Sequence, residues 1–140
     1  MDYRALAEQL MDLHVLLHQS PAGRQLEDLD RGTSLALGYL MAHHKMAHPK
    51  ELGRGMAVSS ARVAALLNHL EDQGLIRRTA DPDDNRQTIV SLTAAGEERI
   101  RQRRAQAVAL LAQLLERLGP EDAAAYLRLR KKLIEALPEA

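Results

Sequence analysis

Residues 49–93 constrain the fold most, because the period of their apolar positions changes twice, first helical and then alternating. A helix from Ser59 or Ser60 to Gln73 is predicted, since its apolar side chains recur at helical spacing, at Val63, Leu66, Leu67 and Leu70. Either serine can accept a hydrogen bond from a free backbone N–H at the helix start. Gly74 supplies the left-handed residue that often ends a helix.

A shorter helix is predicted to precede it, beginning at Pro49, because proline suits the first helical position. A turn near Ala57 and Val58 would separate the two helices. Gly53 and Gly55 lie inside the shorter one and cost about 1 kcal/mol each relative to alanine, so we expect that helix to be less regular.

A hairpin is predicted to follow. Residues 75–79 and 87–92 read as strands, with Thr88, Val90 and Leu92 on one face of the second. The intervening residues 80–86 are rich in aspartate, asparagine and proline, which favour turns. Helix, turn, helix and hairpin together form a winged helix-turn-helix. The predicted fold class is therefore mainly α with a small β-hairpin wing, with helices at both ends.

The outward face of the second helix carries short or polar side chains at its beginning, which can approach base edges in a major groove. Arg86, near the tip of the hairpin, can enter a narrow minor groove, and Asp84 can hold that arginine by a charge-assisted bond. The candidate DNA contacts are Lys50, Ser59, Ser60, Arg62, Ala65, Asn68, Arg78, Asp84 and Arg86.

These residues also form a combination of spacings. Leu70-Glu71 and Gly74-Leu75-Ile76 are followed by Asp84-x-Arg86. After five intervening residues comes Leu92-Thr93, with Gly96 shortly after. In this combination the chain resembles the MarR family of bacterial transcription regulators, most strongly over residues 49–100. The resemblance implies a homodimeric regulator of double-stranded DNA, a repressor in our reading, with one winged domain per subunit.

By the same resemblance, Asp84 and Arg86 would be the wing contacts, and the outward residues from Ser59 to Asn68 would face the groove. Two departures bear on base contacts. Asn85 stands where family members often place a first wing arginine, and Ala65 where many carry an arginine, although Arg62 lies nearly one turn earlier. The resemblance also implies a small-molecule effector between the dimer helices and the winged domain, and we expect no cofactor.

Composition narrows the class of protein. The 140 residues carry no net charge, no cysteine and 2% aromatic residues. The length suits one ordinary domain with helical extensions. Lack of cysteine excludes disulfides, thiolate metal sites and thiol oxidation sensing within this chain, and few aromatic residues argue against single-stranded nucleic acid. No apolar stretch is long enough to span a bilayer, so we expect no membrane partner and a cytoplasmic location.

Leucine-rich helices flank the winged segment. We predict helices over residues 2–19, 33–43 and 94–118, a last one from Glu121, and a polar linker over 24–32. The terminal helices hold more leucine than one small winged domain can cover, which predicts a partner, most simply a second copy. We therefore assign residues 1–32 and 94–140 to dimerisation and 33–93 to DNA binding.

Histidines raise the possibility of a metal. His14 and His18 are spaced to share an ion on one helix face, and His43, His44 and His48 could join them across the fold. The alternatives are two helix-surface histidines and a polar connector before Pro49, or a pH response.

Three classes of function follow from these patterns. A DNA-binding regulator explains most of them, and a metal-responsive regulator of the same fold is a variant of it. A winged protein-interaction module without DNA binding is the alternative that the neutral net charge favours. An enzyme is not expected, since the chain has no cysteine nucleophile and no glycine-rich phosphate loop.

Overall fold

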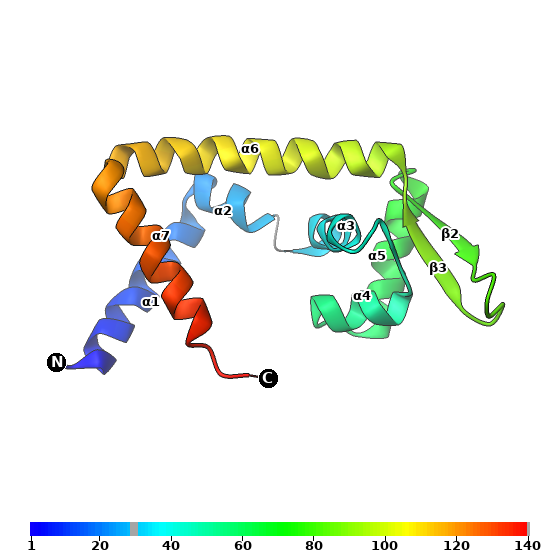
Figure 1. Ribbon diagram of the computed structural model, residues 1–140, viewed down its shortest axis with the longest axis horizontal. Coiled ribbons are helices and arrows are strands. Elements are labelled where there is room, and N and C mark those ends of the chain that lie inside the picture. Colours follow the sequence, from blue (N-terminus) through cyan, green and yellow to red (C-terminus); the bar gives the residue numbers. More distant parts are fainter. Residues whose placement is uncertain (29–30, 140) are drawn as a thin grey trace. The chain divides into compact units, whose positions relative to one another are not determined.

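The structure is a computed structural model that describes residues 1–28 and 31–139. Its elements run α1 (Tyr3–Gln19), α2 (Pro21–Glu27), α3 (Gly32–Ala42), β1 (Met46–Ala47), α4 (Pro49–Met56), α5 (Ser60–Asp72), β2 (Ile76–Ala80), β3 (Thr88–Leu92), α6 (Ala94–Leu118) and α7 (Pro120–Glu135) (Figure 1). The chain divides into two compact units, Met1–Ala105 and Gln106–Ala140. The predicted fold class, mainly α with a small hairpin wing, is confirmed.

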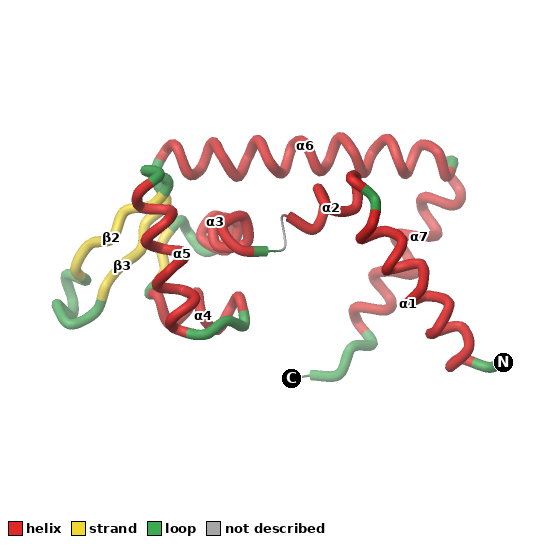
Figure 2. The backbone as a smooth tube through the Cα atoms, turned by 180° about the vertical axis from the view of Figure 1, so that it is seen from behind, coloured by secondary structure: helices red, strands yellow, loops and turns green. Residues whose placement is uncertain are grey.

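The sheet is antiparallel and has the strand order β1-β3-β2. Figure 2 shows its two longer strands, β2 and β3. β2 and β3 form the predicted hairpin, in register from Ile76 opposite Leu92 to Ala80 opposite Thr88. The polar connector predicted before Pro49 was wrong at Met46 and Ala47, which pair with Ser91 and Val90 of β3. A strand of two residues has no period of its own, so only its distant partner defines it.

The hydrophobic core lies where α3, α4 and α5 pack on one another and on the sheet. Leu40, Leu52, Leu70 and Val90, one from each of these elements, are the largest fully buried side chains. They occupy the apolar stripes that the helical and strand periods predict. This packing fixes α5 and the hairpin on one framework.

The two glycines of α4 do not disturb it, because the helix is continuous from Pro49 to Met56. A Cβ on Gly55 would lie 2.1 Å from Cε2 of Tyr39 on α3. Glycine at this position therefore lets α3 and α4 approach closely, which accounts for the residue better than the irregular helix that the sequence suggested.

The ends of α5 follow the predicted chemistry. Ser59 is the N-cap, and its Oγ accepts a hydrogen bond from the backbone N–H of Arg62 at 3.2 Å. Gly74 has a φ of +74°, the left-handed conformation expected after the helix. The Thr93 hydroxyl donates to the Gly74 carbonyl at 2.7 Å and accepts from the Gly96 N–H at 3.1 Å, so it ties the end of α5 to the start of α6.

The region after α1 differs from the prediction. Residues 24–27 of the expected linker belong to α2, while positions 29 and 30 lie outside the described residues. Pro21 begins this helix and the Ser20 side chain caps it by accepting from the Gly23 N–H at 2.9 Å. We predicted no helix here, because a helix of seven residues is too short to show a helical period.

The terminal helices α6 and α7 agree closely with the prediction. α6 spans Ala94–Leu118 as expected, and α7 begins at Pro120 and ends at Glu135, leaving Leu137 beyond it. Among the described residues, neither α1 nor α7 contains a buried residue. Within residues 1–28 and 31–139, no helix has the length and apolarity needed to traverse a lipid bilayer.

Candidate nucleic-acid interface

The helix α5 presents two different faces. Its apolar stripe is buried, whereas Ser59, Ser60, Arg62, Ala65 and Asn68 are exposed. The exposed residues near its N-terminus are small or hydroxylated, apart from Arg62. A short-chained helix end of this kind can come close to base edges.

The wing loop contains an internal contact between Asp84 and Arg86, and the Arg86 side chain is exposed. The Asp84 carboxylate accepts from the backbone N–H of Arg86 at 3.1 Å and from its Nε at 3.3 Å. The Arg86 side chain is nevertheless 92% exposed. The predicted Asp84–Arg86 pairing is therefore present, and the arginine side chain still lies largely in solvent.

Arg78 is engaged within the protein. Its Nη2 donates to Glu71 Oε1 at 2.9 Å and to Asn68 Oδ1 at 2.8 Å, and its backbone N–H donates to Glu71 Oε2 at 3.0 Å. The Arg78 side-chain hydrogen bond is the main cause of a lowered pKa at Glu71. We predicted Arg78 and Asn68 as DNA contacts, but here they bind each other and fasten β2 to the end of α5.

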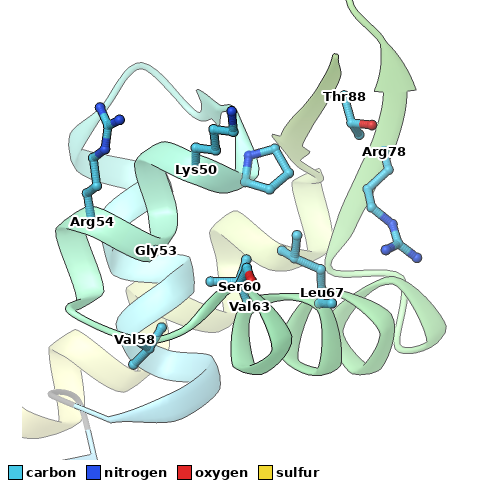
Figure 3. A pocket seen from close by; sticks show the side chains of 11 residues that line it. Lys50, Gly53, Arg54, Val58, Ser60, Val63, Leu67, Arg78 and Thr88 are labelled. Carbon is cyan, nitrogen blue, oxygen red and sulfur yellow. The ribbon is translucent and has the colours of Figure 1, made fainter. Parts of the chain in front are cut away.

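A shallow pocket of about 420 Å³ lies between α4, α5 and β2 (Figure 3). Lys50 and Arg54 project from α4, Arg78 from β2, and Ser60 lines the pocket from the beginning of α5. The remaining lining is mostly apolar and includes Val58, Val63 and Leu67. Since Arg78 is bound by Glu71 and Asn68, Lys50 and Arg54 are the cations here that suit an anionic group such as a DNA phosphate.

Arg54 was missing from the predicted contacts. Lys50 and Arg54 are four residues apart in one helix, so they share a face, and this spacing was the signal that could have found it. Thr88 also lines the pocket and was predicted only as a strand residue.

A second pocket, of about 510 Å³, lies on another side of α5. Arg62, Ala65 and His69 of α5 line it together with Arg31 and Arg103. Arg103 lies in the first half of α6, and its Nη1 donates to Asp28 Oδ2 at 2.6 Å. Two predicted groove residues, Arg62 and Ala65, thus also border a cavity that other cations surround.

The five candidate metal-binding histidines have different partners. The Nε2 atoms of His14 and His18 lie 2.7 Å apart, and His18 Nδ1 also contacts Glu27. The ring of His43 stacks on that of Tyr39 at 3.9 Å, and His48 contacts two carboxylates. In the described part of the chain, His, Cys, Asp and Glu side chains form no group of three or more that could hold a metal ion. The metal hypothesis gains no support from this arrangement.

Comparison with known proteins places the same segment in one family. The model described as "MarR family" matches residues 27–87. The uncharacterized HTH-type transcriptional regulator YdgJ of Bacillus subtilis is 30% identical over 103 residues, which cover 74% of this chain and 58% of that protein. The chain therefore spans less than two thirds of YdgJ. The uncharacterized regulator YwhA of the same organism is 24% identical over 96% of this chain and 100% of its own length.

Solved structures agree in fold. MepR, a transcription regulator of a multidrug efflux pump in Staphylococcus aureus, superimposes with a TM-score of 0.73 at 21% identity, over 99% of this chain and 100% of that one. A structure of MepR in complex with DNA gives a TM-score of 0.61 at 21% identity, over 98% and 99% of the two chains.

Proposed function

We propose that this chain, which belongs to the MarR family of transcription regulators, represses transcription in the cytoplasm by binding a pseudo-palindromic site in double-stranded DNA as a homodimer. A small-molecule effector would relieve repression. The observation that carries the proposal is the juxtaposition of α5, with its exposed Ser60 and Arg62, and a braced hairpin whose Arg86 is open to solvent.

The contacts divide by chemistry. α5 would enter a major groove, where Ser60 and Arg62 meet base edges. Arg86 would reach a neighbouring minor groove, and the pocket beside Lys50 and Arg54 would take a backbone phosphate. Because Arg78 and Asn68 bind each other, we assign them to holding the wing against α5. Support for DNA as the partner also comes from MepR, which adopts this fold and has been captured on DNA.

The apolar surface of the terminal helices supports the dimer. Large apolar side chains of α1 and α7 are exposed, namely Tyr3, Leu6, Leu10, Met11, Leu13, Val15, Leu16, Leu17, Tyr126, Leu127, Leu129, Leu133 and Ile134. Monomeric proteins rarely leave the apolar side chains of a whole helix exposed to this extent. A second copy would cover it and place two α5 helices on successive major grooves.

The cavity beside Arg62 suits the effector. Arg31, Arg62 and Arg103 line it together with one carboxylate, Asp28, which already binds Arg103. The remaining excess of positive charge suits a small carboxylate. A ligand there would contact α5 directly and favour one placement of that helix over another. Binding of a carboxylate should raise the thermal midpoint of the protein. We expect a carboxylate that does so to lower the affinity of the protein for DNA.

A duplex-binding titration tests the proposal. The probe is a fluorescent duplex spanning the DNA immediately upstream of the protein's own coding region, titrated at several salt concentrations. Affinity should fall steeply with salt, since each phosphate contact adds about −0.9 to the slope of log affinity against log salt. Failure to bind any duplex at low salt would leave the winged module as a protein-interaction domain.

Two arginine variants locate the interface. Arg86→Ala should weaken binding to all duplexes by roughly tenfold, whereas Arg62→Ala should change the ranking among operator variants. Arg128→Ala on α7 is the matched control and should leave both affinity and ranking unchanged. If neither Arg86→Ala nor Arg62→Ala alters duplex binding, this interface is wrong.

A further inference from the structure

His48 stands where the helix-turn-helix meets the wing. It is the N-cap of α4, the helix that precedes α5, and its side chain reaches Asp81 at the base of the wing loop. The two residues are 33 positions apart in sequence. A side-chain contact over this separation joins two parts of the proposed DNA-binding surface.

Each ring nitrogen of His48 faces a carboxylate. Nε2 lies 2.8 Å from Asp81 Oδ2, and Nδ1 lies 2.9 Å from Glu51 Oε1. Glu51 also accepts from the backbone N–H of His48 at 2.9 Å, so it is held in place at the beginning of α4. A carboxylate oxygen only accepts hydrogen bonds, and a neutral imidazole has one N–H. Only the imidazolium can therefore donate to both partners.

Asp81 is also hydrogen-bonded to several residues of the wing loop. Its other oxygen, Oδ1, accepts from the Asp83 N–H at 2.9 Å. Its backbone N–H donates to the Gln87 carbonyl at 2.9 Å, and its carbonyl accepts from the Asp84 N–H at 3.2 Å. The residue is buried, although it is charged and lies in a loop. It therefore organises the loop that carries Asp84 and Arg86.

We propose that His48, as an imidazolium, is a positioning residue that fastens the wing to α4, so that the placement of Arg86 depends on pH. The role in DNA binding rests on the proposed function, while the fastening itself does not. A pH response was one of the alternatives for the histidines in the sequence, but the sequence did not indicate Asp81 as the partner of His48.

The titration behaviour of the three groups agrees with the geometry. The hydrogen bond to Asp81 is the main cause of a raised pKa at His48, above its ordinary 6.5. The pKa of Asp81 is lowered, chiefly by the Asp83 backbone N–H and next by His48. The pKa of Glu51 is lowered, chiefly by the His48 backbone N–H. Glu51 from α4 and Asp81 from the wing loop are the charged groups that face the ring, and His43 acts on Glu51 from the end of α3.

The sign of the pH effect follows from the raised pKa. A histidine with a raised folded-state pKa contributes stability that is complete below its unfolded pKa and is lost as pH rises through the folded value. The fastening is thus complete below about 6.5 and weakens above it. At low pH the contact between His48 and its two carboxylates persists until Glu51 and Asp81 become protonated. Because the pKa values of both carboxyl groups are lowered, this requires a more acidic pH than usual.

The first experiment uses the full-length protein without DNA. Histidine ring resonances and wing amide relaxation are followed by NMR between about pH 6 and about pH 8.5, the range in which histidine changes charge. His48→Gln identifies the His48 signal. We expect it to titrate above the ordinary value, and the Asp83 and Gln87 amides to become more mobile in the same pH range. Titration at or below the ordinary value, or wing amides that do not change with pH, would overturn the fastening.

The second experiment measures duplex affinity over the same pH range. Wild-type affinity should fall by roughly two- to fivefold more than that of His48→Gln, the range expected for a part-exposed charge pair. His44→Asn is the matched control, because it removes a nearby exposed histidine from a left-handed position that asparagine tolerates. It should follow the wild-type profile.

Asp81→Asn separates charge from loop structure. The asparagine oxygen can still accept from Asp83, and its amide can donate to a neutral His48 ring, so the wing should stay ordered while the pH dependence disappears. A wild-type pH profile in Asp81→Asn or in His48→Gln would overturn the positioning role. If no variant binds DNA at any pH, the proposed function fails, and the NMR titration still decides whether His48 fastens the wing.

Discussion

The winged region and the terminal helices use leucine in opposite ways. In the winged region, Leu70 of α5 is 0% exposed, and it packs with leucines from α3 and α4. On the terminal helices, Leu10 of α1 is 62% exposed and Leu133 of α7 is 61% exposed. Both sets recur at helical spacing. Helical spacing of leucines therefore identifies the apolar face of a helix, but it does not show which part of the protein, if any, buries that face.

The difference is also energetic. The winged region has its own core, so its residues should behave as interior positions in unfolding experiments. In a monomer, mutations on the exposed faces of α1 and α7 should change the free energy of unfolding as little as surface mutations do. In a dimer that buries these faces, the same mutations should act like mutations of interior residues. Mutations in the two regions therefore test the proposed dimer.

The largest effect is expected in the winged core. Leu70→Ala removes a fully buried side chain and should lower the free energy of unfolding by about 2–5 kcal/mol. Urea unfolding followed by circular dichroism measures this change. A loss below about 1 kcal/mol, the typical effect of an average substitution, would mean that the core is loosely packed.

A smaller but more informative effect is expected on the terminal helices. Leu133→Ala should lower stability by about 1–3 kcal/mol if a partner buries that side chain, and by less than about 0.5 kcal/mol if solvent surrounds it. Lys131→Ala on the same helix is the control. In a dimer, the wild-type thermal midpoint should also rise with protein concentration. A midpoint independent of concentration, with a neutral Leu133→Ala, would remove the dimer.

Most regular elements of the fold could be predicted from the sequence, and two short ones could not. α5 and α6 are long enough to show their period and are bounded by Ser59, Gly74 and Thr93, whose capping and turn chemistry is local. α2 and β1 are too short for that. α2 depends on a cap at Ser20, and β1 depends on pairing with residues more than forty positions away. Local patterns cannot report a distant partner.

The candidate site divides in the same way. Helical spacing predicts that Ser60 and Arg62 are exposed. The Asp84–Arg86 pair is predictable because the two residues are close in sequence. The engagement of Arg78 by Glu71 and the contact between His48 and Asp81 join separate elements. The charged residues could therefore be identified from the sequence, whereas the partners that some of them have within the protein could not.

Close packing inside the winged region gives a third test, of intermediate size. Gly55→Ala would place a Cβ 2.1 Å from Tyr39 Cε2 and should destabilise the fold by about 1–3 kcal/mol through overpacking. Gly38→Ala is the matched control, because a Cβ on that helical glycine meets no atom within 4 Å. It should be neutral or stabilising by up to about 1 kcal/mol. Similar thermal shifts in the two variants would contradict the close approach of α3 and α4.

The smallest effect concerns the beginning of α5. Ser59→Ala removes the cap on the Arg62 N–H and should cost about 1 kcal/mol. Ser59→Asp retains an acceptor at that position and should restore most of the loss. Thermal unfolding measures both. Equal midpoints for all three proteins would mean that the cap adds nothing to the start of this helix.

The most direct test of the central claim is the stoichiometry of the complex with DNA, measured by native mass spectrometry on a duplex that carries an inverted repeat from the DNA upstream of the gene. We predict two chains of 15.5 kDa on each duplex. At moderate salt, a duplex in which one half-site is scrambled should form no complex. A single chain on each duplex, with equal occupancy of the scrambled one, would contradict this prediction.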